Sequence, residues 1–186
     1  YLMEVGTEGA VLRLTDGTEI AGNDLVRVIE GARHFRRVLD AFPTNYPRAI
    51  LEQAALAGAF DPGRADADLQ AVADTVAKRL NLIAPEFERG WQGRITQDHG
   101  IRLSRILRGV EELRTLDGAV LRSGEARKLG QIAGQYRDIY RDPARLVRKD
   151  REQAIHGPVD LLKSILTEGE KGLTLQRYKG LGEMNP

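Results

Sequence analysis

Residues that favour β-structure near the start of the chain predict a short hairpin. Residues 10–14 form its first strand, Asp16-Gly17-Thr18 is a turn signal, and residues 19–21 return. Apolar residues then recur every three or four positions, as on the buried face of an amphipathic helix. The first such helix is expected to begin at an N-cap on Asn23 and to end near Ala41.

Two more helices are predicted before residue 86. One begins at Pro47, a residue suited to the first turn of a helix, and closes at Gly58. The next is capped by Asp66 or Asp68 and stops at Pro85. The first half of the chain is therefore expected to be mainly helical.

The period of the apolar residues changes from Phe87 onwards. Strands are predicted around residues 87–95, 101–106 and 109–115, and the first two flank a turn at residues 97–100. These three strands are expected to form an antiparallel sheet.

A helix capped by Ser123 is predicted next. Two interior glycines, Gly130 and Gly134, each weaken that helix by about 1 kcal/mol relative to alanine.

The last part of the chain mixes element types. A short strand or loop is expected after Pro143, and Gly157-Pro158 should open a helix that ends before Gly172. A strand over residues 173–177 and a glycine-containing loop over 178–182 follow. The predicted fold class is α+β, an antiparallel sheet with several amphipathic helices.

Composition excludes several classes of protein. The chain has no cysteine, which rules out disulfide frameworks, thiolate metal sites and cysteine nucleophiles. No apolar run approaches the roughly 18 residues that span a bilayer, so we expect no membrane partner and a cytoplasmic location. The start at Tyr1 and the end at Pro186 suggest a piece of a longer protein.

Charge is distributed unevenly along the chain. Residues 87–151 contain 15 Lys and Arg against 9 Asp and Glu, whereas residues 1–86 contain 9 against 13. Nearly all the cations of the basic segment are arginines, which bind phosphate in a bidentate manner. Either a DNA-binding face or a solvated arginine-rich surface explains this segment. The arginines proposed for DNA contact are Arg102, Arg105 and Arg108, and one face shared with Arg94, Arg114 and Arg122 would favour DNA.

Three other candidates have simpler structural explanations. Asp66 and Asp68 have the spacing of a Mg²⁺-binding carboxylate pair, but a helix cap explains them better. The histidines, at positions 34, 99 and 156, lack metal-ligand spacing. Trp91 is either a core residue or a stacking surface for a base. No catalytic residue and no metal site is therefore predicted.

The closing segment places cations beside glycines. Arg177, Tyr178 and Lys179 precede Gly180-Leu181-Gly182, which is too short for a dinucleotide-binding fingerprint. Glycine allows close backbone approach, so this segment suits either phosphate contact or a tight turn between domains.

Residues 176–186 read Gln-Arg-Tyr-Lys-Gly-Leu-Gly-Glu-Met-Asn-Pro. They resemble the signature near the end of the Toprim domain in the B subunits of DNA gyrases, which are type IIA topoisomerases. Residues 5–171 resemble the insertion in the Toprim domain of Gram-negative members, with Ala21-Gly22 before the long helix and Tyr46-Pro47-Arg48-Ala49 before the second. Topoisomerase IV, with a looser version of the signature, is the alternative.

The resemblance implies a parent enzyme that uses ATP and Mg²⁺ to supercoil double-stranded DNA negatively, together with the gyrase A subunit. Residues 1–156 would be an inserted accessory module, with a helical part at 1–86 and a basic sheet-containing part at 87–151. Residues 157–186 would return to the Toprim domain. The family's catalytic glutamate and metal ligands precede the insertion, and its active-site tyrosine belongs to the A subunit.

This chain alone is therefore expected to be inactive and to hold no cofactor. Its role would be accessory, through DNA contact, through coupling to the gyrase A subunit and to other domains of the B subunit, or through both. A purely structural spacer is the alternative. The motif positions that carry over are Arg177, Tyr178, Lys179, Gly180, Leu181 and Gly182, with Arg177 and Lys179 as candidate phosphate contacts.

Overall fold

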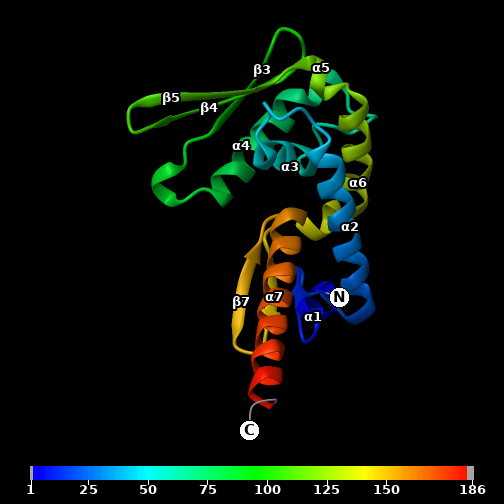
Figure 1. Ribbon diagram of the computed structural model, residues 1–186. Coiled ribbons are helices and arrows are strands. Elements are labelled where there is room, and N and C mark those ends of the chain that lie inside the picture. The colour runs from blue at the N-terminus through cyan, green and yellow to red at the C-terminus, as the bar shows by residue number, and fades with distance from the viewer. Residues whose placement is uncertain (1, 184–186) are drawn as a thin grey trace. The chain divides into compact units, whose positions relative to one another are not determined.

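The protein is α+β, as predicted, with two antiparallel sheets in place of the single sheet expected (Figure 1). This computed structural model describes residues 2–183. The chain forms two compact units. Unit 1 contains Tyr1–His34 and Ile139–Pro186, and unit 2 contains Phe35–Asp138. The predicted division into an inserted module and a Toprim segment concerns the parent protein and stays a prediction.

Unit 1 is built on a four-stranded sheet in the order β2-β1-β6-β7. The predicted opening hairpin is confirmed, and a second hairpin joins it where a single strand or loop was expected. Leu12 lies opposite Leu146 in the register, and both are buried. The strands are β1 (Val11–Arg13), β2 (Glu19–Ala21), β6 (Ala144–Arg148) and β7 (Arg151–Ile155).

Two helices of unit 1 lie against each other where glycines remove the side chain. A Cβ on Gly6 of α1 (Leu2–Thr7) would stand 1.9 Å from the carbonyl oxygen of Ile165 in α7 (Pro158–Glu183). A Cβ on Gly169 would stand 2.1 Å from the carbonyl oxygen of Leu2. Helix α1 was not predicted, because its six residues are too few to show a helical period.

The strand predicted over residues 173–177 is wrong, and so is the loop over residues 178–182. Both segments belong to α7, which passes through Gly172 without ending. A Cβ on Gly172 would lie 2.6 Å from the side chain of Val5, so this glycine makes room for α1 and does not stop the helix. Met184, Asn185 and Pro186 lie outside the described residues.

Unit 2 packs one helix, α4, against one face of a three-stranded sheet in the order β3-β4-β5, and α3 packs on α4. All three strands and their antiparallel pairing were predicted, with β3 shorter than expected because Phe87 lies in a 3-10 turn, Glu86–Glu88. The elements wholly within the unit are α3 (Arg48–Leu56), α4 (Leu69–Ile83), β3 (Gln92–Ile95), β4 (Ile101–Leu107), β5 (Val110–Leu116) and α5 (Gly118–Leu121).

Two long helices, α2 (Gly22–Asp40) and α6 (Gly124–Tyr140), contribute residues to both units. The predicted cap of α6 is confirmed, since the Ser123 hydroxyl accepts a hydrogen bond from the Ala126 amide at 3.1 Å. Two other predicted caps are wrong. Asn23 lies inside the first turn of α2, which begins at Gly22, and the side chain of Asp68 makes no cap hydrogen bond at the start of α4.

Glycine also allows close backbone packing inside unit 2. A Cβ on Gly93 of β3 would stand 2.4 Å from the carbonyl oxygen of Ala73, so this residue lets α4 lie directly against the strand. A Cβ on Gly130 of α6 would stand 2.2 Å from the carbonyl oxygen of Phe60. At Gly134, one turn further along α6, the same Cβ would meet nothing within 4 Å. The two interior glycines of α6 therefore have different roles.

Substituting each of these glycines by alanine should change stability in opposite directions. Gly130→Ala forces α6 away from the Phe60 carbonyl and should lower the free energy of unfolding by about 2 kcal/mol. Gly134→Ala adds a better helix former in open space and should raise it by about 1 kcal/mol. Urea unfolding followed by circular dichroism measures both. Equal stabilisation by the two variants would contradict the close packing at Gly130.

Candidate nucleic-acid interface

The three-stranded sheet of unit 2 sorts the predicted arginines onto two faces. Buried Ile101 and Leu103 mark the inner face of β4, which packs on α4. Because side chains alternate along a strand, Arg105 belongs to this inner face and Arg102 to the outer one. The basic segment therefore does not present its arginines on one shared face.

Arg105 is largely buried and occupied by contacts within unit 2. Its side chain is 13% exposed, and its Nε lies 2.8 Å from a carboxylate oxygen of Glu112. Its Nη1 donates to the carbonyl oxygen of Glu88 at 2.6 Å. The guanidinium carbon stands 4.4 Å from the ring centroid of Trp91, a cation–π contact. Arg105 therefore joins β4, β5 and the turn at residues 86–88, and its charge is neutralised locally.

Three further arginines of the basic segment lie at separate places in unit 2. Arg114 lies on the inner side and contacts Glu112 at 3.0 Å. Arg108 occupies the β4–β5 turn with a positive φ of 52°. Arg122 donates to the carbonyl oxygen of Asp98 at 3.3 Å. No single surface gathers them.

Arg94 and Arg102 do share a surface, the outer face of the sheet. They are directly opposite each other in the β3–β4 register, and both are exposed. Neither forms an ion pair with any residue that the structure describes. Like charges directly opposite each other destabilise a sheet, so this pair suits an anionic partner.

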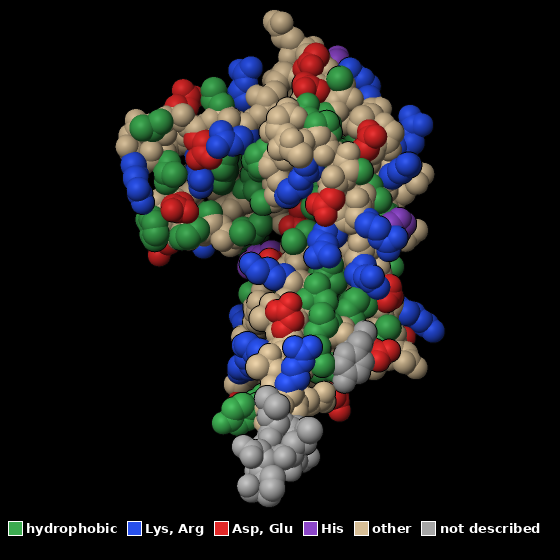
Figure 2. Space-filling model, viewed as in Figure 1, with side chains coloured by type: hydrophobic (Ala, Val, Ile, Leu, Met, Phe, Trp, Pro, Cys, Tyr) green, Lys and Arg blue, Asp and Glu red, His purple; other side chains and the backbone are tan. Residues whose placement is uncertain are grey.

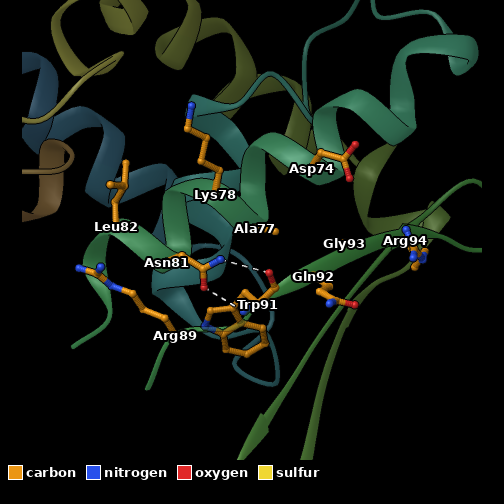
Figure 3. Close-up of a pocket in the computed structure, with 10 residues that line it drawn as sticks. All are labelled: Asp74, Ala77, Lys78, Asn81, Leu82, Arg89, Trp91, Gln92, Gly93 and Arg94. Carbon is orange, nitrogen blue, oxygen red and sulfur yellow. Dashed lines mark hydrogen bonds between the residues drawn. The ribbon is translucent and has the colours of Figure 1, made fainter. Parts of the chain in front are cut away.

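A groove of about 480 Å³ runs between α4 and β3 (Figure 3). Three of its lining cations, Lys78, Arg89 and Arg94, form no ion pair among the described residues, and Asp74 is the one acidic residue of the lining. In the figure, Lys78 and Arg89 lie toward one end and Arg94 toward the other. The groove is positively charged, and it could not be predicted from sequence because it forms only where α4 packs against β3.

The Trp91 ring belongs to the core, one of the two roles considered from sequence. It is 8% exposed and covered by Arg105. Its backbone is held by Asn81 of α4, whose side-chain oxygen accepts from the Trp91 amide at 2.8 Å and whose side-chain nitrogen donates to the Trp91 carbonyl at 3.2 Å (Figure 3). The Asn81 side chain thus hydrogen-bonds both the N–H and the C=O of Trp91, as the backbone of a neighbouring strand would.

Arg177, Tyr178 and Lys179 lie on consecutive positions of α7 and are exposed, Tyr178 by 77%. Successive residues of a helix are about 100° apart around its axis, so Arg177 and Lys179 point to nearly opposite sides. One phosphate therefore cannot contact both from the same side. Gly180, Leu181 and Gly182 belong to the same helix.

Unit 1 has a second charged groove, of about 520 Å³, between β7 and α7. Arg151 lies 2.8 Å from Glu168, and this hydrogen bond is the main reason why the pKa of Glu168 is lowered. Arg148 donates to the carbonyl oxygen of Gly6 at 3.0 Å, and burial lowers its pKa. Opposite charges neutralise each other here, which makes this groove a weaker anion site than the groove beside β3.

The other sequence candidates are not brought together. Asp66 and Asp68 are exposed in a 3-10 turn, and His99 lies 3.9 Å from Asp66. His156 is 3.7 Å from Asp160 at the start of α7, and His34 is exposed on α2. Among the described residues, no group of three or more acidic or histidine side chains is arranged to hold a metal ion.

Known proteins similar to this chain carry one name. The DNA gyrase B subunit of Caulobacter vibrioides is 38% identical over 188 residues, which cover all of this chain. The chain is homologous to part of the B subunit of DNA gyrase. The corresponding proteins of Rickettsia conorii and Rickettsia bellii are 29% and 26% identical, again over the whole chain. The predicted resemblance is confirmed, and it extends well beyond residues 176–186. No family model matches the chain.

The chain spans about a fifth of the length of these gyrase proteins, 22% for Caulobacter and 23% for both Rickettsia proteins. Within the described part of this gyrase B relative, no helix is long and apolar enough to cross a bilayer.

Replacing Arg105 should disturb unit 2 far more than replacing Arg102. Arg105→Ala leaves Glu112 without its closest cation and uncovers Trp91, and should lower the free energy of unfolding by about 2–3 kcal/mol. Trp91 is the single tryptophan of the chain, so its fluorescence reports the change directly in urea titrations.

Arg102→Ala is the matched control, on the exposed face of the same strand, and should change stability by less than about 0.5 kcal/mol. Equal effects of the two variants would mean that Arg105 is not a structural residue.

Proposed function

We propose that this chain is an accessory, non-catalytic part of the B subunit of a DNA gyrase, and that it couples neighbouring domains and subunits during ATP-dependent negative supercoiling. The observation that carries the proposal is the use of Arg105 inside unit 2 instead of on a DNA-facing surface. Other cations are used in the same way. Arg137 forms a bidentate pair with Asp61 at 2.6 and 2.9 Å, and Arg48 donates to three backbone carbonyls.

Such contacts suit a part that transmits force between domains. A bidentate arginine fixes both distance and orientation, and a buried arginine–tryptophan contact excludes water from the join. Both kinds of contact resist relative movement of the elements that they connect. We place the DNA-cleavage chemistry, ATP and Mg²⁺ elsewhere in the parent enzyme, in accord with the family resemblance.

The full-length parent protein provides the test of coupling. Deletion of residues 41–117, which removes the sheet of unit 2 and the helices packed on it, should reduce supercoiling at least tenfold while ATP hydrolysis continues. The readout is the number of supercoils introduced per ATP consumed. A deletion enzyme with unchanged supercoiling would refute the proposal, and an enzyme that also stops hydrolysing ATP would point to misfolding or to a role in the ATPase cycle.

DNA contact is a second candidate function, and the unpaired Arg94 and Arg102 favour it. Two arginines next to each other on an exposed face, with Lys78 and Arg89 also without an ion pair among the described residues of the neighbouring groove, give a patch that phosphates would neutralise. Arg108 at the hairpin tip and the α7 residues Arg177, Tyr178 and Lys179 are further candidates on separate surfaces.

Fluorescence anisotropy with a short DNA duplex tests this second function. If the outer face binds DNA, the double variant Arg94→Ala with Arg102→Ala should weaken binding at least tenfold and reduce the slope of log K against log salt by about two. The matched control, Arg33→Ala, removes a cation that already pairs with Glu30, and should leave binding unchanged. An equal loss in the control would show that only net charge matters.

A further inference from the structure

β5 forms an unprotected edge of the sheet in unit 2. In the sheet order β3-β4-β5, β4 pairs with it on one side, and no described strand pairs with it on the other. The two-residue turn Arg108-Gly109, with φ of 52° and 78°, closes the hairpin on the pair Leu107 and Val110. In such a hairpin the closing pair is hydrogen-bonded, and bonded and non-bonded pairs then alternate.

This alternation fixes which backbone groups of β5 point outward. Glu112 and Arg114 exchange hydrogen bonds with β4, whereas Glu111, Leu113 and Thr115 direct their N–H and C=O groups away from it. Among the described residues, these outward groups have one partner, the side chain of Arg114, which donates to the Leu113 carbonyl at 2.8 Å. The edge is open to another strand.

The opposite edge of the same sheet is closed. Asn81 occupies both backbone groups of Trp91, and the side chain of Gln70 donates to the Gly93 carbonyl at 3.0 Å. Helix α4 therefore covers the edge of β3, as proteins commonly protect sheet edges. β5 lacks such a cover, and exposed apolar side chains lie near this edge, with Leu113 47% and Ile106 72% exposed. Figure 2 shows hydrophobic side chains at the surface in this part of the molecule.

The order of charges along β5 identifies a partner. An antiparallel copy of β5 must place residues of the same face opposite each other, so the pairing is centred on a residue. The registers centred on residues 112, 113 and 114 keep most of the strand paired. Centring on residue 112 puts Glu112 opposite its own copy, and centring on residue 114 puts Arg114 opposite its own copy. Like charges directly opposite each other are unfavourable.

Centring on Leu113 gives the opposite result. Glu112 then lies opposite Arg114 of the second copy, twice by symmetry, and Leu113 lies opposite Leu113. The outward backbone groups of residues 111, 113 and 115 also meet their counterparts in this register, and Ile106 of each copy flanks the central leucines on the outer face. Charge and apolar contact therefore both favour this register, and its backbone hydrogen bonding is compatible with pairing.

We propose that β5 pairs antiparallel with β5 of a second copy of this chain, centred on Leu113, so that two three-stranded sheets become one six-stranded sheet. The interface is isologous, which closes the assembly at two copies. The contact is small, so we expect a dimer with a dissociation constant on the order of 0.1 mM, which sedimentation equilibrium measures.

Thr115 gives a matched pair of variants that separates pairing from folding. In the dimer, Thr115 lies opposite Glu111 of the other copy, whereas within one chain it lies opposite Arg102. Thr115→Glu should weaken the dimer about tenfold through carboxylate repulsion at two places, although the new carboxylate beside Arg102 stabilises the fold. Thr115→Lys should tighten the dimer about tenfold and destabilise the fold.

In each variant, dimer affinity and fold stability are expected to change in opposite directions. If fold stability alone controlled the dimer, affinity would instead rise and fall with the free energy of unfolding. Dimer affinity that rises with fold stability across this pair would overturn the proposal.

Cross-linking tests the register. The chain has no cysteine, so Leu113→Cys introduces one thiol, which would lie roughly 5 Å from its copy across the dimer axis. A short bismaleimide reagent should join the two chains. Glu111→Cys is the control, because its two copies would be roughly 13 Å apart along the strands, and it should cross-link far less. Equal cross-linking of both variants would reject this register.

Two further outcomes would also overturn the proposal. The first is a wild-type chain that stays monomeric up to about 1 mM. The second is a monomeric full-length parent protein in which the amides of residues 111, 113 and 115 are protected from hydrogen exchange, because a strand from elsewhere in that protein would then cover the edge.

Discussion

Close backbone contact at glycine is the constraint on which both units depend. In unit 1, Gly6 and Gly169 let α1 lie against α7 at a distance that no Cβ would permit. In unit 2, Gly93 does the same for β3 and α4. The position of α4 then decides which face of the sheet is buried, and so which arginines are turned inward. The positions of the glycines therefore decide, through the packing of α4, which arginines remain on the surface.

The elements that could be predicted from sequence are those with a complete period of their own. Helices α2, α3, α4 and α6 and the strands of unit 2 repeat apolar residues often enough to show their type. The failures have two causes. α1 is too short to show a period. Gly172 has the sequence pattern of a helix end, but its missing side chain accommodates Val5. A glycine required for packing and a glycine required for a turn are identical in sequence.

The candidate site was predicted in composition but not in arrangement. The excess of arginine between residues 87 and 151 is real, yet counting charges cannot tell Arg102 from Arg105, which differ in face. Period-two alternation would have separated them once the strand boundaries were known. The contacts of Arg105 with Trp91 and Glu88 are invisible in sequence, because they connect residues 14 and 17 positions away through the fold. Such contacts depend on tertiary packing.

The two edges of the unit 2 sheet show how charge pattern refines an argument from exposure. Charged residues on an edge strand commonly prevent association, and Glu111, Glu112 and Arg114 fit that description by number alone. The order of these charges also matters. An edge strand that carries charges of one sign repels a second copy in every register, and so prevents association best. β5 instead places opposite charges in contact in one register and like charges in the two beside it. The charge pattern thus favours one register over the two beside it. Such a preference is expected of a strand that pairs with its own copy.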